Sequence, residues 1–251
     1  MAGHSKWANI KHRKARQDAK RGKIFTTLAR EVTVAARSGG DDPQFNFRLR
    51  LAIDRAKAAN MPNDTIERAI KRGTGELEGA QLEDITYEAY APHGIALLIQ
   101  VVTDNRNRTV AELRKVFNRQ GGSLGESGSV MWQFDRKGRI VVETDGSDPE
   151  ELALLAIDAG ADDFEIDEGL VSIYTVPSDL EAVKNELESS AASITDAELT
   201  LVPKTTLELD GEQALKTLRL MEALEDLDDV QQVISNLDIS DEMIAQFEEA
   251  A

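Results

Sequence analysis

The sequence contains no cysteine. A chain without thiols forms no disulfide, no thiolate metal site and no cysteine nucleophile. Aromatic residues make up only 5% of the chain, and no base-stacking module is evident. It also lacks any run of about 18 apolar residues, the length that a membrane-spanning helix needs. The first residues have neither the apolar core of a signal peptide nor a myristoylation start. We therefore expect a cytoplasmic protein with no membrane partner.

Catalytic motifs are equally scarce. Residues 121–125 match G-x-S-x-G, but a nucleophile elbow needs a strand before the serine and a helix after it. Here the pattern predicts a helix before and a strand after. No phosphate-binding loop and no H-E-x-x-H occurs, and the acidic cluster Asp226, Asp228 and Asp229 lacks calcium-loop spacing. We interpret that cluster as solvated surface, and we expect a protein that is not an enzyme and needs no cofactor or metal.

The charges that are present divide unevenly along the 251 residues. Residues 1–77 hold 17 Lys and Arg against 8 Asp and Glu, which gives +9. The remainder holds 29 − 17 = 12 basic and 46 − 8 = 38 acidic residues, which gives −26. This asymmetry indicates a basic region that binds a polyanion, attached to an acidic body.

The first 23 residues predict a cationic helix. At about 100° per residue, Ala8, Ala15 and Ala19 fall within one narrow arc, while most of the cations spread over the opposite half. Such crowded like charges disfavour a helix unless a polyanion neutralises them, and a phosphate backbone is the expected partner. The candidate contacts are Lys6, Lys11, Arg13, Lys14, Arg16, Lys20, Arg21 and Lys23. The alternative is a solvated charged helix with no partner.

Trp7 is a further candidate of this segment, as a ring that stacks on a base. A tryptophan beside an apolar stripe is more often a core anchor, and that alternative is the favoured one.

Periodicity divides the rest of the chain into three regions. Apolar residues at helical spacing predict helices up to about residue 79, one opening at Asp42-Pro43 and another ending at Gly73. Alternating residues then predict two strands, a helix that Thr109 and Glu112 cap, and a strand through Val130, Trp132 and Phe134.

An internal repeat follows in the stretches RIVVETDGSDPEEL and LVSIYTVPSDLEAV, each reading strand, loop, capping box and helix. The predicted boxes are Ser147 with Glu150 and Ser178 with Glu181. Two such units make βαββαβ, the ferredoxin-like plan. The predicted fold is α+β: an N-terminal helical domain followed by two α/β ferredoxin-like domains, the last inserted into the middle one. The predicted domains are 1–79, basic and helical; 80–135 plus 205–238, the middle domain; 138–203, the acidic insertion; and 239–251, an acidic tail.

A second basic element lies within the acidic body. Five cations cluster around the helix predicted from Thr109: Arg106, Arg108, Arg114, Lys115 and Arg119. Arg108, Lys115 and Arg119 share one stripe by i, i+7, i+11 spacing, and these three with Arg106 are the candidate contacts. This element is the predicted contact of the middle domain with the same polyanion. The alternative is a helix face balanced by local carboxylates.

Four stretches carry a resemblance to a known family: AGHSKWANIKHRKARQDAKRGK, AKAANMPNDTIERAIKRGTGELEG, TDNRNRT and GGSLGESGSVMWQF. The sequence resembles the YebC family over nearly its whole length. The resemblance implies a helical N-terminal domain with two α/β domains, and a bacterial regulator of transcription that binds DNA. The mitochondrial relative of this family activates translation of a cytochrome oxidase subunit. A second description of the family implies a ribosome-bound factor that assists the synthesis of proline-rich stretches. Arg16 and His93 depart from the family pattern, which implies a small residue and a glycine at these positions.

We therefore expect a nucleic-acid-binding regulator of gene expression, acting on DNA in transcription. The alternative is a translation factor that contacts ribosomal RNA, and the acidic surface is a candidate site for a protein partner.

Overall fold

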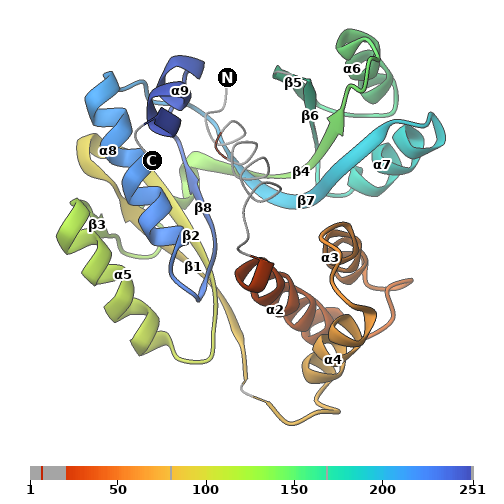
Figure 1. The fold of residues 1–251 in the computed structure, drawn as a ribbon, viewed down its shortest axis with the longest axis horizontal. Helices are drawn as coiled ribbons and strands as arrows, with labels where there is room; N and C mark the ends of the chain where they lie inside the picture. Colours follow the sequence, from red (N-terminus) through yellow and green to blue (C-terminus); the bar gives the residue numbers. More distant parts are fainter. Residues whose placement is uncertain (1–6, 8–20, 80, 168, 250–251) are drawn as a thin grey trace. The chain divides into compact units, whose positions relative to one another are not determined.

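The computed structural model describes Trp7 and residues 21–79, 81–167 and 169–249 (Figure 1). The chain divides into two compact units, one of Met1–Phe134 with Pro203–Ala251 and the other of Asp135–Val202. The second unit corresponds to the predicted insertion, for which the sequence analysis gave the bounds 138–203. An N-terminal helical region and two sheets confirm the predicted α+β class. No helix in the described part of the chain is long and apolar enough to cross a membrane.

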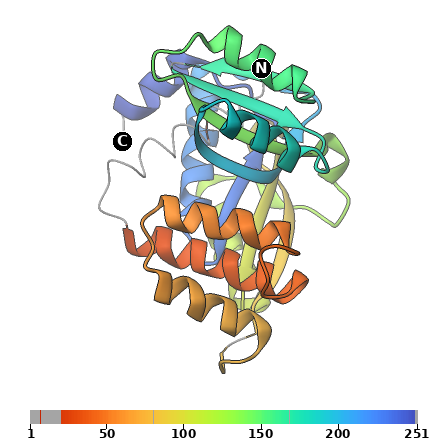
Figure 2. The ribbon, with the colours of Figure 1, turned by 90° about the vertical axis from the view of Figure 1, so that its right-hand side faces the viewer.

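From residue 21 on, the first unit begins with the helices α2 (Arg21–Gly39), α3 (Phe47–Ala58) and α4 (Asn63–Thr74), shown side by side in Figure 2. They enclose a small apolar core that includes Val32, Leu49 and Ile66. α2 and α4 approach closely at Gly73, where an added Cβ would lie 2.4 Å from the Thr33 carbonyl oxygen.

Two helix ends differ from prediction because of this packing. α3 begins after Asn46 rather than at Asp42-Pro43, since the buried Asn46 side chain accepts a hydrogen bond from the Leu49 N–H (3.1 Å) and donates to the Ala35 carbonyl (2.8 Å). α4 continues through Gly73 and ends at Gly75, whose φ of 83° is the left-handed conformation that favours glycine.

The first sheet has the order β3-β1-β2-β8. Its strands are β1 (Glu83–Tyr90), β2 (Ala96–Thr103), β3 (Ser123–Leu124) and β8 (Val230–Ser235). α5 (Arg106–Gln120) and α8 (Gly211–Glu225) bury their apolar residues against it, and β8 pairs antiparallel with β2. The last strand of this sheet therefore comes from beyond the second unit.

The predicted strand through Val130 and Trp132 is wrong. Residues Met131–Gln133 form a 3-10 turn, and Trp132 is 67% exposed. The cause is Glu88, a buried carboxylate on β1 that accepts hydrogen bonds from the N–H groups of Gly128, Val130 (2.6 Å) and Met131 (2.8 Å). Burial alone would raise the pKa of Glu88, but these three bonds to the ionised form hold the pKa below its ordinary value.

The second unit contains β4 (Phe134–Glu143), α6 (Pro149–Asp158), β5 (Asp163–Asp167), β6 (Leu170–Thr175), α7 (Leu180–Ser189) and β7 (Ser193–Pro203). The strand order β5-β6-β4-β7 is that of the ferredoxin-like plan. Each helix starts one residue later than the predicted capping boxes require. Asp148 caps α6 by accepting from the Glu150 N–H (2.9 Å), and Asp179 precedes α7.

Residues 239–251 are not simply an acidic tail. They include α9 (Asp241–Glu249), which places Ile244 and Phe247 in the core of the first unit together with Ile239.

Candidate nucleic-acid interface

The structure describes only part of the N-terminal basic segment. The predicted contacts Lys6, Lys11, Arg13, Lys14, Arg16 and Lys20 lie outside the described residues, as does the side chain of Arg21. Two candidates of this segment, Trp7 and Lys23, are described with their contacts.

Trp7 is a core residue and not an exposed stacking platform. Its side chain is 2% exposed, and its ring meets Phe247 of α9 edge to face at 5.6 Å between centroids. The indole N–H donates to a carboxylate oxygen of Glu225 at 3.1 Å. The core-anchor interpretation therefore holds, because a ring enclosed in this way has no free face for a base.

Lys23 is also occupied within the first unit. Its ammonium donates to the Glu225 carbonyl at 2.8 Å and lies 3.7 Å from an Asp226 carboxylate oxygen. A phosphate would have to displace these contacts, so Lys23 is a weaker candidate for phosphate binding than an unpaired cation.

Arg108 is held by internal carboxylates. Its guanidinium donates to both oxygens of Asp229 (2.7 and 3.0 Å) and to Asp104 (2.8 Å). The hydrogen bond and the charge of Asp229 raise the pKa of Arg108 above its ordinary value. Arg106 is paired in the same way, because its Nε donates to Glu83 at 2.8 Å. For these two cations the alternative of local charge balance is the one observed.

Asp229 is the buried centre of this cluster, and sequence reasoning missed it. It was predicted to be solvated but is 1% exposed. Besides Arg108, it accepts from the hydroxyls of Thr103 (3.0 Å) and Thr109 (2.8 Å). Burial alone would raise its pKa, but the bonds from Arg108 and the two threonines hold that pKa below its ordinary value.

Arg30 of α2 joins the same cluster, and no sequence signal distinguishes it from other helix-surface arginines. Its guanidinium lies 3.2 Å from an Asp229 oxygen and donates to the carbonyls of Val102 and Asp228. Thr109, predicted as a helix cap, is buried in this network, and Asn105 caps α5 instead by accepting from the Arg108 N–H (3.1 Å). The network ties the helical region to the first sheet.

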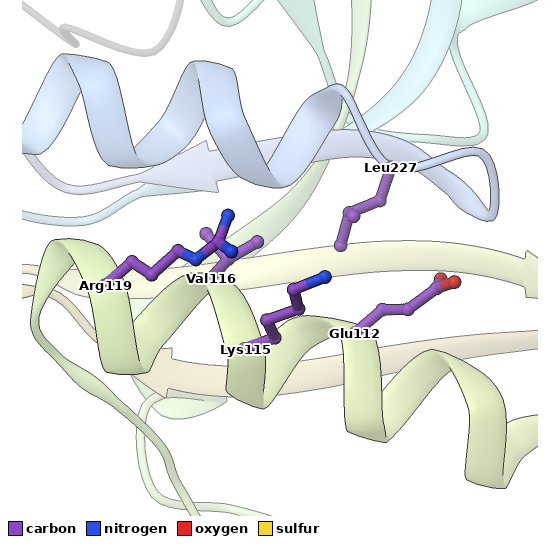
Figure 3. A pocket seen from close by; sticks show the side chains of 5 residues that line it. All are labelled: Glu112, Lys115, Val116, Arg119 and Leu227. Atoms are coloured by element: carbon purple, nitrogen blue, oxygen red, sulfur yellow. The ribbon is translucent and has the colours of Figure 1, made fainter.

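Lys115 and Arg119 remain as exposed cations on α5. They line a shallow hollow of about 220 Å³ with Glu112, Val116 and Leu227 (Figure 3). Leu227 reaches the hollow from the loop after α8, opposite the α5 side chains. Within the described part of the chain, no ion pair is found for either cation. The predicted stripe thus divides into an internally paired end and an exposed end.

The geometry defines a class: an α+β protein in which a basic helical region is joined to two acidic sheet-containing regions. Comparison with family models shows which family of this class the chain matches. The TACO1/YebC protein N-terminal domain matches residues 5–76, and the TACO1/YebC second and third domain matches residues 82–237. The chain belongs to the TACO1/YebC family, as the sequence resemblance predicted.

Similar proteins cover the same length. A "Probable transcriptional regulatory protein" of Moorella thermoacetica is 57% identical over 95% of this chain and 96% of its own. One of the same name from Pelotomaculum thermopropionicum is 55% identical over 96% of this chain and 100% of its own. The crystal structure of a conserved hypothetical protein from Aquifex aeolicus superposes with a TM-score of 0.84, at 51% identity over 89% of this chain and 93% of that one.

Proposed function

We propose that the protein is a non-enzymatic regulator of transcription that binds duplex DNA through its basic N-terminal segment. The observation that carries the proposal is the charge division, +9 in residues 1–77 against −26 in the remainder. The names of its relatives support the same role.

The exposed end of the α5 stripe supplies a second contact. Lys115 and Arg119 are exposed and unpaired in the described chain, whereas Arg106 and Arg108 already neutralise carboxylates. The surrounding acidic surface repels a phosphate backbone and so restricts the orientations in which DNA docks. The second contact with DNA therefore depends on Lys115 and Arg119 and on where α5 places them.

Salt dependence tests the N-terminal contact. Each phosphate that a cation neutralises makes the slope of log affinity against log salt more negative by about 0.9 on duplex DNA, so about five contacts give a slope near −4.5. The variant Arg13→Ala/Lys14→Ala/Lys20→Ala/Arg21→Ala is expected to flatten the slope by about 0.9 for each residue that contacts phosphate, and to weaken binding to all sequences about equally.

A matched variant, Arg136→Ala/Lys184→Ala/Lys216→Ala/Arg219→Ala, removes four charges from the acidic body and is expected to keep the slope. Fluorescence anisotropy of a labelled duplex measures both, and thermal melting checks folding. An unchanged slope in a folded N-terminal variant refutes the proposal.

A paired variant tests the second contact. Lys115→Ala/Arg119→Ala is expected to flatten the slope of log affinity against log salt by about 1 to 2. Arg106→Ala is expected to leave the slope unchanged, because Glu83 already holds that side chain.

A sucrose gradient of cell lysate tests the kind of nucleic acid. Co-migration with ribosomes that survives DNase would overturn DNA as the target and favour ribosomal RNA.

A further inference from the structure

The second unit carries most of the net negative charge of the protein. Residues 135–202 contain 4 Lys and Arg and 18 Asp and Glu, so their net charge is 4 − 18 = −14, against −17 for the whole chain. A unit of this charge repels nucleic acid and repels other copies of itself. Its charge therefore favours a partner that carries positive charge.

This unit also exposes large apolar side chains along one border. β5 is an edge strand of its sheet, and α6 packs beside it (Figure 1). On α6, Leu154 is 63% exposed and Ile157 is 39% exposed. On β5, Phe164 and Ile166 are 37% and 41% exposed and lie on the same face of the strand, two residues apart. We call these four residues the α6–β5 border.

Acidic side chains surround the α6–β5 border. Glu150 and Asp158 lie four residues on either side of Leu154, and so share its face of the helix. Asp163, Glu165 and Asp167 alternate with the two apolar residues of β5. Charges on an edge strand protect it from pairing with a like-charged strand. A strand of opposite charge meets no such barrier.

We propose that the α6–β5 border binds a basic protein segment in extended conformation, with lysines or arginines alternating with apolar residues. The segment adds to the sheet beside β5, where the backbone of an edge strand offers hydrogen-bonding groups. Its apolar side chains cover Leu154, Ile157, Phe164 and Ile166, and its cations meet the flanking carboxylates. Border-to-border pairing of two copies is disfavoured, because two borders of net negative charge would face each other. The proposal does not depend on DNA binding.

Synthetic peptides test the surface on the full chain. The probe is an eight-residue peptide of alternating Lys and Val, labelled for fluorescence anisotropy, and the control peptide replaces each Val by Ser at the same charge. The Lys-Val peptide is expected to bind at least about tenfold more tightly, because burying apolar side chains adds to charge attraction. Amide chemical shifts of the labelled protein are expected to change along β5 and α6.

Matched variants locate the site. Leu154→Ser/Ile166→Ser is expected to weaken the Lys-Val peptide by about tenfold or more. Leu199→Ser is the control, since Leu199 is 43% exposed on β7 at the opposite edge of the same sheet. If the double variant melts early, Leu154→Ser alone replaces it, because the more exposed side chain contributes less to the core.

Several results would overturn the proposal. Equal binding of the two peptides would mean attraction by charge alone, and equal weakening by Leu199→Ser would mean no defined site. Shift changes confined to the other unit would place the peptide elsewhere. A dimer in sedimentation that Leu154→Ser dissociates would identify a second copy as the occupant.

Discussion

Removal of the Asp229 charge is expected to destabilise the first unit. The variant Asp229→Asn keeps the shape of the side chain but places an amide, with two N–H donors, among groups that all donate. Arg108 and the hydroxyls of Thr103 and Thr109 bond to the carboxylate, and Arg30 lies within ion-pair distance. One amide oxygen cannot accept from all of them.

The magnitude follows from the burial of each donor. Thr103 and Thr109 are fully buried, and a hydrogen bond to a charged group contributes about 1.5–3 kcal/mol. The Arg108 side chain is 43% exposed and keeps its bond to Asp104, so solvent screens its interaction with Asp229 and the two threonines dominate the expected loss. Because Asn retains one acceptor, the expected loss in free energy of unfolding is about 2–4 kcal/mol.

Urea denaturation followed by tryptophan fluorescence measures this loss. Both tryptophans of the chain, Trp7 and Trp132, lie in the first unit, so the signal reports its unfolding separately from the second. The control is Asp228→Asn: that carboxylate is exposed, and the Asp228 group that Arg30 contacts is its carbonyl. The control is expected to stay within about 0.5 kcal/mol of the parent protein. A loss below about 1 kcal/mol for Asp229→Asn would refute the assigned network.

The same network predicts a pH dependence. The folded pKa of Asp229 lies below its unfolded value of about 3.9, so the ionised carboxylate stabilises the fold above that value. This contribution is lost as the pH falls from about 5 through the folded pKa. The parent protein is therefore expected to lose stability over this range more steeply than Asp229→Asn. Parallel pH profiles of the two proteins would contradict the lowered pKa.

Four further substitutions test other contacts. Glu88→Gln, which weakens acceptance from three backbone N–H groups, is expected to cost about 2 kcal/mol and to speed hydrogen exchange at residues 128–131; unchanged exchange there would contradict its role. Gly73→Ala forces α2 and α4 apart and is expected to cost more than about 2 kcal/mol, whereas Gly75→Ala, strained only by its φ, costs about 1 kcal/mol; equal melting temperatures would show that the helices yield. Trp7→Phe leaves a Glu225 oxygen without the indole N–H and is expected to cost about 1–2 kcal/mol in urea unfolding, and an unchanged midpoint would contradict that bond.

Local signals in the sequence were sufficient for the class of fold. Periodicity predicted the helices of the first region and the strands β1 and β2. The internal repeat predicted the βαββαβ order of the second unit. These features depend on which residues alternate or recur along the chain, so they survive without knowledge of distant contacts. The charge division, and with it the proposed polyanion contact, is likewise a property of the chain alone.

Contacts between distant residues decided the rest. Asp229 is followed by a strand and reads as part of an acidic surface run, yet it lies buried because Thr103, Thr109 and Arg108 converge on it from over a hundred residues away. Residues 130–134 alternate like a strand, but Glu88 binds their backbone and forms a turn. The sequence alone determined which segments fold and where charge accumulates. Only the tertiary structure decided which charges are free, because pairing a cation with a carboxylate depends on distance in space and not on spacing along the chain.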